Sequence, residues 1–494
     1  MKVGFVTFGC RLNRAEALDM EAQYAAAGWE VVPAERSTNP KIKRSNTLNS
    51  NTQTLLTQTL KNPNTPSPDL IIVRGCSVTA RAQRDCEKEI AHLRAQFPHA
   101  EIHITGCLDI RSPAHSAPLH SLVREANHLP SNSNNTTTKQ PDNPILHSLV
   151  REANPSPNQS NNLTIKQSNN LPLPLRLSRA YLKVQDGCSG RCSFCIVPSF
   201  RGAPVSVPFA DVLARARAYI DAGFRELVLT GCNLCLYHDS GRGLPELAAA
   251  IAALESLGHR VRLGSIEPGI CDTRLLDALE SHPNICRSLH LSLQSGSDRI
   301  LRLMRRPYTT EQIATFCAEA RRRLGPRLAL GADIITGFPG ETDGDHEATR
   351  SFLGPPPPPS TKASNTTPNQ SNNLTIKQSN NLTMPPFIHL HVFPYSERPG
   401  TEAAAMKPAV PVAVRRARAK ELERIGTANR AAFAHTLIGQ EVTVCVEKDG
   451  NGRSDEYFRC LLKGTAPRRS LVRATVEDYF PKTGTLSATI RTKD

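Results

Sequence analysis

The sequence predicts an α/β protein that ends in a small antiparallel β-barrel, and two observations predict this fold class. Short apolar runs alternate with helical patterns over residues 1–111 and again over 178–410, as in parallel sheets covered by helices. The stretch 436–494 instead carries short alternating strands separated by Gly, Asp, Asn and Pro turns. A chain of 494 residues has room for about three domains of ordinary size.

The composition favours a polyanionic partner and gives no sign of a membrane span. The formal net charge is +15, which favours binding to a polyanion such as RNA. No stretch of 18 apolar residues occurs, and the apolar run at the start is too short for a signal peptide. We therefore expect a soluble, cytoplasmic protein without membrane contact. In that reducing compartment the 14 cysteines predict metal ligands and buried thiols, not disulfides.

Residues 1–111, with an insert at 37–68, form the first predicted domain. Its apolar runs share a Gly-Cys pair close behind each run: Val3 to Phe8 precedes Gly9-Cys10, Leu70 to Val73 precedes Gly75-Cys76, and Ile102 to Thr105 precedes Gly106-Cys107. Helical patterns over 14–27 and 79–97 separate the runs, which predicts a parallel sheet. Because neighbouring parallel strands open onto one crevice at their carboxyl ends, we expect Cys10, Cys76 and Cys107 to converge. The alternative is three separately buried thiols.

Three stretches, 37–68, 112–177 and 354–385, are rich in Asn, Ser, Thr, Gln and Pro. Such composition cannot bury enough apolar surface to offset the entropy lost on ordering. The string NQSNNLTIKQSNNL occurs identically at 158–171 and 369–382, without the steady period of a solenoid. We interpret the three stretches as insertions into surface loops, where added length costs little free energy. A basic RNA-binding tail is the alternative, although dense Lys/Arg runs are lacking.

Residues 178–410 form the second predicted domain, a series of six strand and helix pairs. The strand-like runs are Ala180 to Gln185, Glu226 to Thr230, Val261 to Ile266, Ser288 to Leu293, Leu328 to Thr336 and Phe387 to Val392. Six units are two fewer than a closed barrel of this type has, so we expect a partial (β/α)6 barrel. Chemistry in such barrels gathers behind the carboxyl ends of the strands, where the sequence has Thr230, Gly231, Glu267, Gln294 and Ser295. Ordinary turn formation is the alternative role for these positions.

The most informative stretch is DGCSGRCSFC, residues 186–195, behind the first of these runs. Cys188, Cys192 and Cys195 form a C-x-x-x-C-x-x-C array inside one loop. Four-iron clusters normally have four thiolate ligands, so a trio suggests a cluster with one iron open to a substrate or cofactor. A structural zinc site and a disulfide loop are the alternatives. A second pair, Cys232 and Cys235, has C-x-x-C spacing and is a weaker candidate for a redox or zinc pair.

The cysteine array, with Phe194 before its last member, resembles the cluster motif of the radical S-adenosylmethionine (SAM) enzymes. The longer string DGCSGRCSFCIVPSFRG is similar to that of the methylthiotransferases, which insert sulfur and a methyl group into a C–H bond. The resemblance implies two 4Fe–4S clusters and SAM as cofactors. It makes Cys188, Cys192 and Cys195 the ligands of the first cluster.

In the same family the positions of Cys10, Cys76 and Cys107 match the ligands of the second cluster. Cys86, inside the helical pattern over 79–97, competes with these cysteines as a ligand of the second cluster. We expect Cys86 to be structural instead. The chain departs from the family at Arg74-Gly75, where Asn-Thr is usual. The resemblance further implies that the loops at Phe194, Thr230, Gly231, Glu267, Gln294 and Ser295 hold SAM.

Two regions are predicted to contact RNA. The basic string around Arg305 and Arg306 follows the fourth strand of the second domain, near the expected mouth of the barrel. A helical connector over 411–435 leads to 436–494, which resembles the TRAM domain, an RNA-binding appendage of RNA-modifying enzymes. A merely solvated basic face is the alternative for the two arginines.

The strings TFGCRLN and LHVFPYSERPGTEAA are most similar to the branch that acts on N6-threonylcarbamoyladenosine at position 37 of tRNA. The expected partners are therefore the anticodon stem-loop of tRNA, an electron donor and a sulfur source. The alternatives are the branch that acts on N6-isopentenyladenosine and the branch that modifies an aspartate of a ribosomal protein. A noncatalytic iron–sulfur protein that binds RNA is an alternative of another class.

Overall fold

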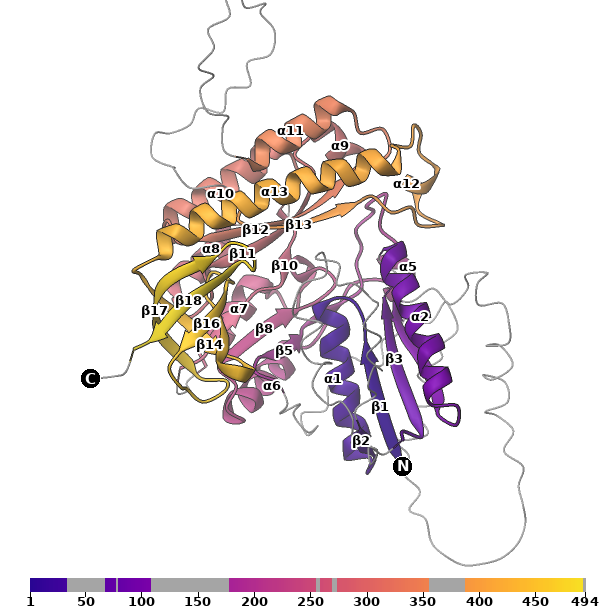
Figure 1. Cartoon of the computed structure of the whole chain (residues 1–494), viewed down its shortest axis with the longest axis vertical. Coiled ribbons are helices and arrows are strands. Elements are labelled where there is room, and N and C mark those ends of the chain that lie inside the picture. Colours follow the sequence, from indigo (N-terminus) through magenta and orange to yellow (C-terminus); the bar gives the residue numbers. More distant parts are fainter. Residues whose placement is uncertain are drawn as a thin grey trace, which may run out of the picture. The chain divides into compact units, whose positions relative to one another are not determined.

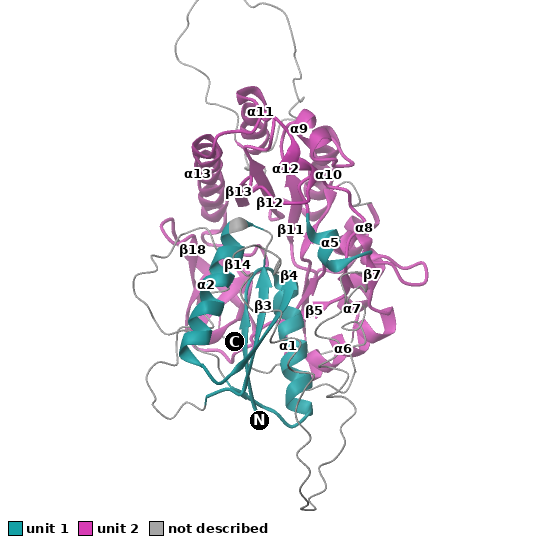
Figure 2. Ribbon diagram, turned by 90° about the vertical axis from the view of Figure 1, so that its right-hand side faces the viewer, with its two compact units in different colours: residues 1–174, 196–203 teal, residues 175–195, 204–494 magenta. Residues whose placement is uncertain are grey.

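The computed structural model describes residues 1–32, 67–76, 79–107, 177–254, 258–268, 273–354 and 387–491. They fall into two compact units, residues 1–174 with 196–203 and residues 175–195 with 204–494 (Figure 2). The predicted inserts at 37–68, 112–177 and 354–385 lie almost wholly outside the described residues. Within the described part of the chain, no helix is long and apolar enough to cross a membrane.

The first unit contains a four-stranded parallel sheet in the order β2-β1-β3-β4. Its elements are β1 (Lys2–Thr7), α1 (Arg11–Ala26), β2 (Glu30–Val32), β3 (Leu70–Cys76), α2 (Ala80–Gln96), β4 (Glu101–Cys107) and α5 (Val197–Arg201). The three predicted strands and two predicted helices are present. The sequence pattern missed β2, because three residues are too few to show a period.

Alternation of side chains along these strands supplies two apolar layers, one on each face of the sheet. Val6, Ile71 and Val73 pack with residues of α2, whereas Val3 and Ile72 pack with residues of α1 and the turn after it. Successive residues of a strand point to opposite faces, so a doubly covered strand must be apolar at every position. The buried run at the start of β3 has that pattern.

The second unit holds two parallel sheets, in the orders β5-β8-β9 and β10-β11-β12-β13. Their strands are β5 (Ala180–Lys183), β8 (Glu226–Thr230), β9 (Arg260–Arg262), β10 (Ser265–Ile266), β11 (Ser288–Gln294), β12 (Ala329–Thr336) and β13 (His389–Pro394). The third predicted strand is interrupted between β9 and β10. At this break a side-chain carbon on Gly264 would stand 2.9 Å from the carbonyl oxygen of Leu229, so the backbones approach closely. The partial six-stranded barrel stays a prediction.

Helices cover these sheets. They are α6 (Phe209–Asp221), α7 (Leu244–Ala252), α8 (Thr273–Ser281), α9 (Asp298–Leu303), α10 (Thr310–Leu324), α11 (Asp343–Leu353), α12 (Glu402–Ala405) and α13 (Val412–Leu437). Ser297, Thr309 and Thr342 cap α9, α10 and α11 with side-chain oxygens, as the sequence favours at helix starts. The long α13 packs on β12 and β13 beside α11 (Figure 1). Two short strands, β6 (Gln185–Asp186) and β7 (Val205–Ser206), pair antiparallel, and the short 3-10 helix η3 (Leu234–Leu236) follows β8.

The chain ends in a closed five-stranded barrel, in the order β14-β15-β16-β18-β17. The strands are β14 (Glu441–Val446), β15 (Asn451–Ser454), β16 (Arg459–Lys463), β17 (Leu471–Phe480) and β18 (Thr485–Ile490), with the short 3-10 helix η5 (Lys448–Gly450) before β15. The predicted small barrel is confirmed, but the prediction that it is antiparallel throughout is wrong, because β16 and β18 pair parallel. The residues NGRS of β15 are typical of a turn, so the sequence pattern does not indicate this strand.

Candidate metal centres

The cysteine loop of the second unit follows β6 and brings two thiols around one glycine. A side-chain carbon on Gly190 would stand 3.2 Å from Cys188 Sγ and 3.7 Å from Cys192 Sγ. The Gly190 N–H donates to Cys188 Sγ at 3.3 Å, and the Cys195 N–H donates to the Cys192 carbonyl at 3.0 Å. All three cysteines are half-buried. The bare backbone at Gly190 therefore leaves room for the sulfurs and for what they bind.

Ser193 and Phe194 attach this loop to α9. The Ser193 hydroxyl donates to the Leu303 carbonyl at 2.8 Å, and its backbone N–H donates to the Met304 carbonyl at 3.2 Å. Phe194 packs against an apolar cluster that contains Met304 and Phe338. Phe194 therefore fixes the loop, and its contact with a cofactor stays a prediction.

Arg306 contacts a sulfur of the cysteine loop. Its guanidinium donates to Cys192 Sγ at 3.0 Å and pairs with Glu267 at 3.0 Å, and only 5% of its side chain is exposed. Burial alone would lower the pKa of Arg306, but Tyr308, Cys192 and Glu267 outweigh burial and hold this pKa above its usual range. Arg305 is different, since half of its side chain is exposed and it pairs with Glu402. Arg305 is therefore more open to a polyanion than Arg306, and RNA contact at the two arginines stays a prediction.

The residues predicted to hold SAM lie at or just after the carboxyl ends of strands, as expected from the sequence. Thr230 ends β8, and a side-chain carbon on Gly231 would stand 3.0 Å from the Gln185 carbonyl, so this position needs a glycine. Gln294 ends β11 with a φ of 73°, and Ser295 is buried and bonded to α11. Glu267 follows β10 and accepts from Asn233 at 2.5 Å as well as from Arg306. Contact of these residues with SAM stays a prediction.

The three predicted cluster cysteines of the first unit gather at one edge of its sheet. Cys76 and Cys107 stand opposite each other in the parallel register of β3 and β4. Cys10 precedes α1 directly, and its thiol is close enough to Cys107 to raise the pKa of Cys107. Gly9 has a φ of 92°, and a side-chain carbon there would stand 2.9 Å from Cys76 Sγ. The predicted convergence of the three Gly-Cys pairs is thus found within this unit.

Arg201 at the end of α5 connects this cysteine trio to polar side chains of α1. Its Nε donates to Cys107 Sγ at 3.0 Å, and its terminal nitrogens donate to Glu16 at 2.8 Å and to Asn13 at 2.8 Å. The Asn13 amide in turn donates to the backbone carbonyls of Phe8 and Gly75, each at 2.9 Å. Burial raises the pKa of the Cys107 thiol, and Arg201 opposes this shift. The sequence analysis missed this network, because its partners lie up to 188 positions apart.

Arg74, where the chain departs from the family pattern, belongs to the same network. It pairs with the buried carboxylate of Glu16, and it donates to Met20 Sδ at 3.2 Å. Glu16 therefore lies between two guanidiniums, those of Arg74 and Arg201. The two cations offset the charge of this buried carboxylate beside the cysteines.

Both trios fit an iron–sulfur cluster by donor chemistry. Thiolates are the usual protein ligands of such clusters, and ligation requires the thiol to lose its proton. Burial raises the pKa of both Cys188 and Cys107, but each has a nearby N–H donor that favours the thiolate, from Gly190 and Arg201 respectively. A glycine beside each trio, Gly190 or Gly9, leaves space that a side chain would fill.

The remaining candidate cysteines have partners of other kinds. Cys86 is fully buried, and its sulfur accepts from the Cys76 backbone N–H at 3.3 Å, as expected for a structural thiol. Cys232 donates to Asp186 at 3.3 Å, whereas Cys235 accepts from the Glu267 backbone N–H at 3.3 Å. The two members of this C-x-x-C pair thus bond to different segments.

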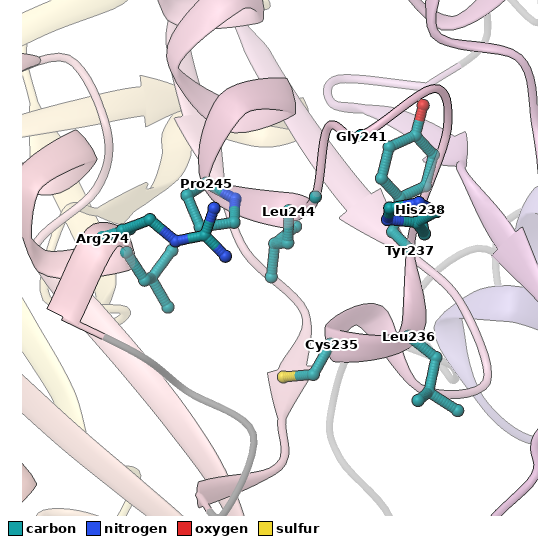
Figure 3. Close-up of a pocket in the computed structure, with 10 residues that line it drawn as sticks. Cys235, Leu236, Tyr237, His238, Gly241, Leu244, Pro245 and Arg274 are labelled. Carbon is teal, nitrogen blue, oxygen red and sulfur yellow. The ribbon is translucent and has the colours of Figure 1, made fainter.

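A pocket of about 410 Å³ lies beside Cys235 and η3 (Figure 3). Its wall comes from the segment after β8 and from the starts of α7 and α8: Cys235, Leu236, Tyr237, His238, Gly241, Gly243, Leu244, Pro245, Arg274 and Leu275. Burial raises the pKa of Tyr237 to about 12, with Asp239 adding to the rise, so this phenol stays neutral. None of the predicted cluster ligands lines this pocket.

Comparisons with known proteins find similarity to radical SAM enzymes and to tRNA methylthiotransferases. A model of the Radical SAM superfamily matches residues 182–353, which include the cysteine loop. The threonylcarbamoyladenosine tRNA methylthiotransferase MtaB of Aquifex aeolicus is 27% identical, over 96% of this chain and 100% of that protein. MtaB of Chlamydia pneumoniae is 31% identical over 77% of this chain and 78% of that protein. The tRNA-2-methylthio-N(6)-dimethylallyladenosine synthase of Cereibacter sphaeroides is 35% identical over 61% of this chain and 64% of that protein.

Proposed function

Since the chain belongs to the radical SAM methylthiotransferases, we propose that it converts N6-threonylcarbamoyladenosine at position 37 of tRNA to its 2-methylthio derivative. The observation that carries this proposal is the similarity to an MtaB enzyme over 96% of the chain. It is joined by two cysteine trios, each gathered at strand ends within its own unit. The higher identity to a dimethylallyladenosine enzyme makes that nucleoside the second candidate, but the alignment covers less of both chains.

The proposed cofactors are two 4Fe–4S clusters and SAM. Cys188, Cys192 and Cys195 hold one cluster, and Cys10, Cys76 and Cys107 hold the other. When bound, the first cluster would supply one-electron chemistry toward SAM, and the second would hold the sulfur to be transferred. An electron donor and a sulfur source are the further partners of this reaction.

The chain's own residues prepare these sites in two ways. Gly190 and Gly9 keep the space beside the sulfurs open. Arg306 and Arg201 each direct an N–H donor at one sulfur of a trio. At Cys107 this donor opposes the rise in pKa that burial causes. Glu267, beside Arg306 and Asn233, then offers a fixed carboxylate to a bound ligand such as the ammonium group of SAM.

RNA contact is proposed for the C-terminal barrel and for Arg305. The net charge of +15 suits a polyanion, and the exposed Arg305 follows the α9 helix that anchors the cysteine loop. The five-stranded barrel is the size of small RNA-binding barrels. We place this reaction in the cytoplasm.

The test is nucleoside mass spectrometry on tRNA from cells that lack the gene, with and without the gene restored. The 2-methylthio derivative of N6-threonylcarbamoyladenosine should disappear and return with the wild-type gene. A gene carrying Cys188→Ala should not restore it, whereas Cys317→Ala, which changes a buried thiol of α10, is the matched control. A change confined to the isopentenyl derivative would refute the proposed substrate but keep the reaction.

Anaerobic reconstitution of the purified protein separates the enzyme from a noncatalytic RNA-binding protein. The enzyme should bind two clusters and form 5′-deoxyadenosine from SAM. Cys10→Ala should remove about half of the bound iron, because one of two clusters loses a ligand. Unchanged iron content in this variant would contradict the assignment of the second cluster, and cluster binding without SAM cleavage would contradict the enzymatic proposal.

A further inference from the structure

Three neighbouring strands of the second unit each contribute one potential metal ligand to a single cluster of side chains. His290 lies on β11, Asp333 on β12 and His391 on β13. Asp333 Oδ1 is 2.9 Å from His290 Nε2 and 3.1 Å from His391 Nδ1. The three ligand atoms all lie within 4.8 Å of one another, and the imidazole centres are 4.6 Å apart.

The register of the sheet creates this arrangement. Asp333 stands opposite His391 across β12 and β13, while His290 stands opposite Gly331 across β11 and β12. A side-chain carbon on Gly331 would stand 2.5 Å from His290 Nδ1, so the imidazole occupies the space that a side chain at 331 would need. Gly331 thereby lets His290 lie across β12 and reach Asp333, two residues further along that strand.

We propose that His290, Asp333 and His391 form a binding site for a divalent first-row transition-metal ion such as Zn²⁺. Two imidazoles and one carboxylate on one side of an ion are a frequent ligand set for zinc and ferrous iron, and they leave coordination positions open. The side chains are 15%, 21% and 29% exposed for His290, Asp333 and His391, so water and ions reach them. Without an ion, the same spacing would result from two imidazole N–H groups that hydrogen-bond to one carboxylate oxygen of Asp333. An ion would replace both of these hydrogen bonds, and each imidazole would then carry its proton on its other ring nitrogen.

Two neighbouring polar groups on the same strands, His389 and the Ser292 carbonyl, have partners outside this site. His389, two residues before His391, already bonds to the Glu456 carbonyl at 2.8 Å and does not join the trio. On the other side, Ser292 follows His290 by two residues, and its carbonyl accepts from Arg306 under the cysteine loop. The ion would therefore lie two residues along β11 from Ser292, which bonds to the arginine that contacts the cysteine loop. Its open positions suit water or an anionic oxygen of a ligand.

The test measures zinc on the full-length protein after reconstitution of its clusters, so that cluster cysteines are occupied. The protein is freed of loose metal on a chelating resin and then dialysed against Zn²⁺, and bound zinc is measured by mass spectrometry. One zinc per chain is expected. Asp333→Asn and His290→Gln should each weaken zinc binding at least about 100-fold, since losing a ligand costs more than losing an outer hydrogen bond.

The matched control is His346→Gln, because His346 pairs with the single carboxylate of Glu421 at 2.9 Å without a second imidazole. This variant should keep the zinc. Zinc K-edge absorption of the wild-type protein should show nitrogen and oxygen neighbours that include two imidazoles, a result that does not depend on any variant folding. Sulfur neighbours alone, no bound zinc, or equal zinc in the wild type and Asp333→Asn would each overturn the proposal. The site stands independently of which nucleoside the enzyme modifies.

Discussion

Replacing Glu226 by glutamine should strongly destabilise the second unit. Glu226 lies on β8 with no exposed side-chain surface, and its carboxylate bonds to Arg260 Nε at 2.8 Å and to Arg262 Nε at 2.8 Å. Arg179 is 3.5 Å away. Burial alone would raise the pKa of Glu226, but these three guanidiniums outweigh burial and hold this pKa well below its usual range.

The loss of stability in Glu226→Gln follows from the hydrogen bonds that Arg260 and Arg262 make to the C-terminal barrel. Arg260 donates to the carbonyls of Thr443 and Arg453, and Arg262 donates to those of Ser454 and Asp455, all in the C-terminal barrel. Removing one partner of a buried ion pair typically costs about 3 to 5 kcal/mol, because the other charge is left buried without compensation. A loss of 1 kcal/mol lowers the melting temperature of a domain of 150–250 residues by about 2 to 4 °C. The expected decrease is therefore at least about 6 °C.

Calorimetry at a fixed scan rate on the wild type and Glu226→Gln, both loaded with clusters under anaerobic conditions, measures this difference. The control is Glu319→Gln, whose partner Arg322 is 71% exposed on α10, so little or no change is expected. If the two variants melt within about 1 °C of each other, the buried arginine cluster does not stabilise the C-terminal barrel.

Three further predictions concern the sites and the pH response. Gly9→Ala should lose about half of the reconstituted iron, whereas Gly28→Ala should not, because both have positive φ but only position 9 faces Cys76 Sγ, at 2.9 Å. Arg201→Gln should lower the reduction potential of the cluster at Cys107, measured by a redox titration followed by electron paramagnetic resonance, since a positive charge and an N–H donor to sulfur are lost; an unchanged potential would refute this role. His389→Gln should flatten the loss of stability below about pH 6.5 in melting experiments. Burial, then Arg430, holds the pKa of His389 well below its usual range, so only the unfolded chain takes up a proton there and acid favours unfolding.

The sequence predicted features that repeat locally, and it could not predict partners distant along the chain. The Gly-Cys pairs were enough to predict that Cys76 and Cys107 meet, because parallel strands put their carboxyl ends at one edge. The pairing of Arg306 with Glu267 was not predicted, since a basic string carries no sign of which of its members turns inward. The break between β9 and β10 was missed, because Val261 to Ile266 is apolar enough to read as one strand.

The two cysteine trios have the same electrostatic arrangement, built from unrelated segments. In each, one arginine donates to a cysteine sulfur at 3.0 Å and pairs with a buried carboxylate: Arg201 with Glu16, and Arg306 with Glu267. A guanidinium can serve sulfur and carboxylate together because its donors lie in a rigid plane, whereas a lysine ammonium is a single point charge. The carboxylate fixes the orientation of the arginine and offsets its charge, so the sulfur gains a directed hydrogen bond at little cost in net charge. Arginine to lysine changes at either position should therefore disturb the neighbouring trio even though the charge is kept.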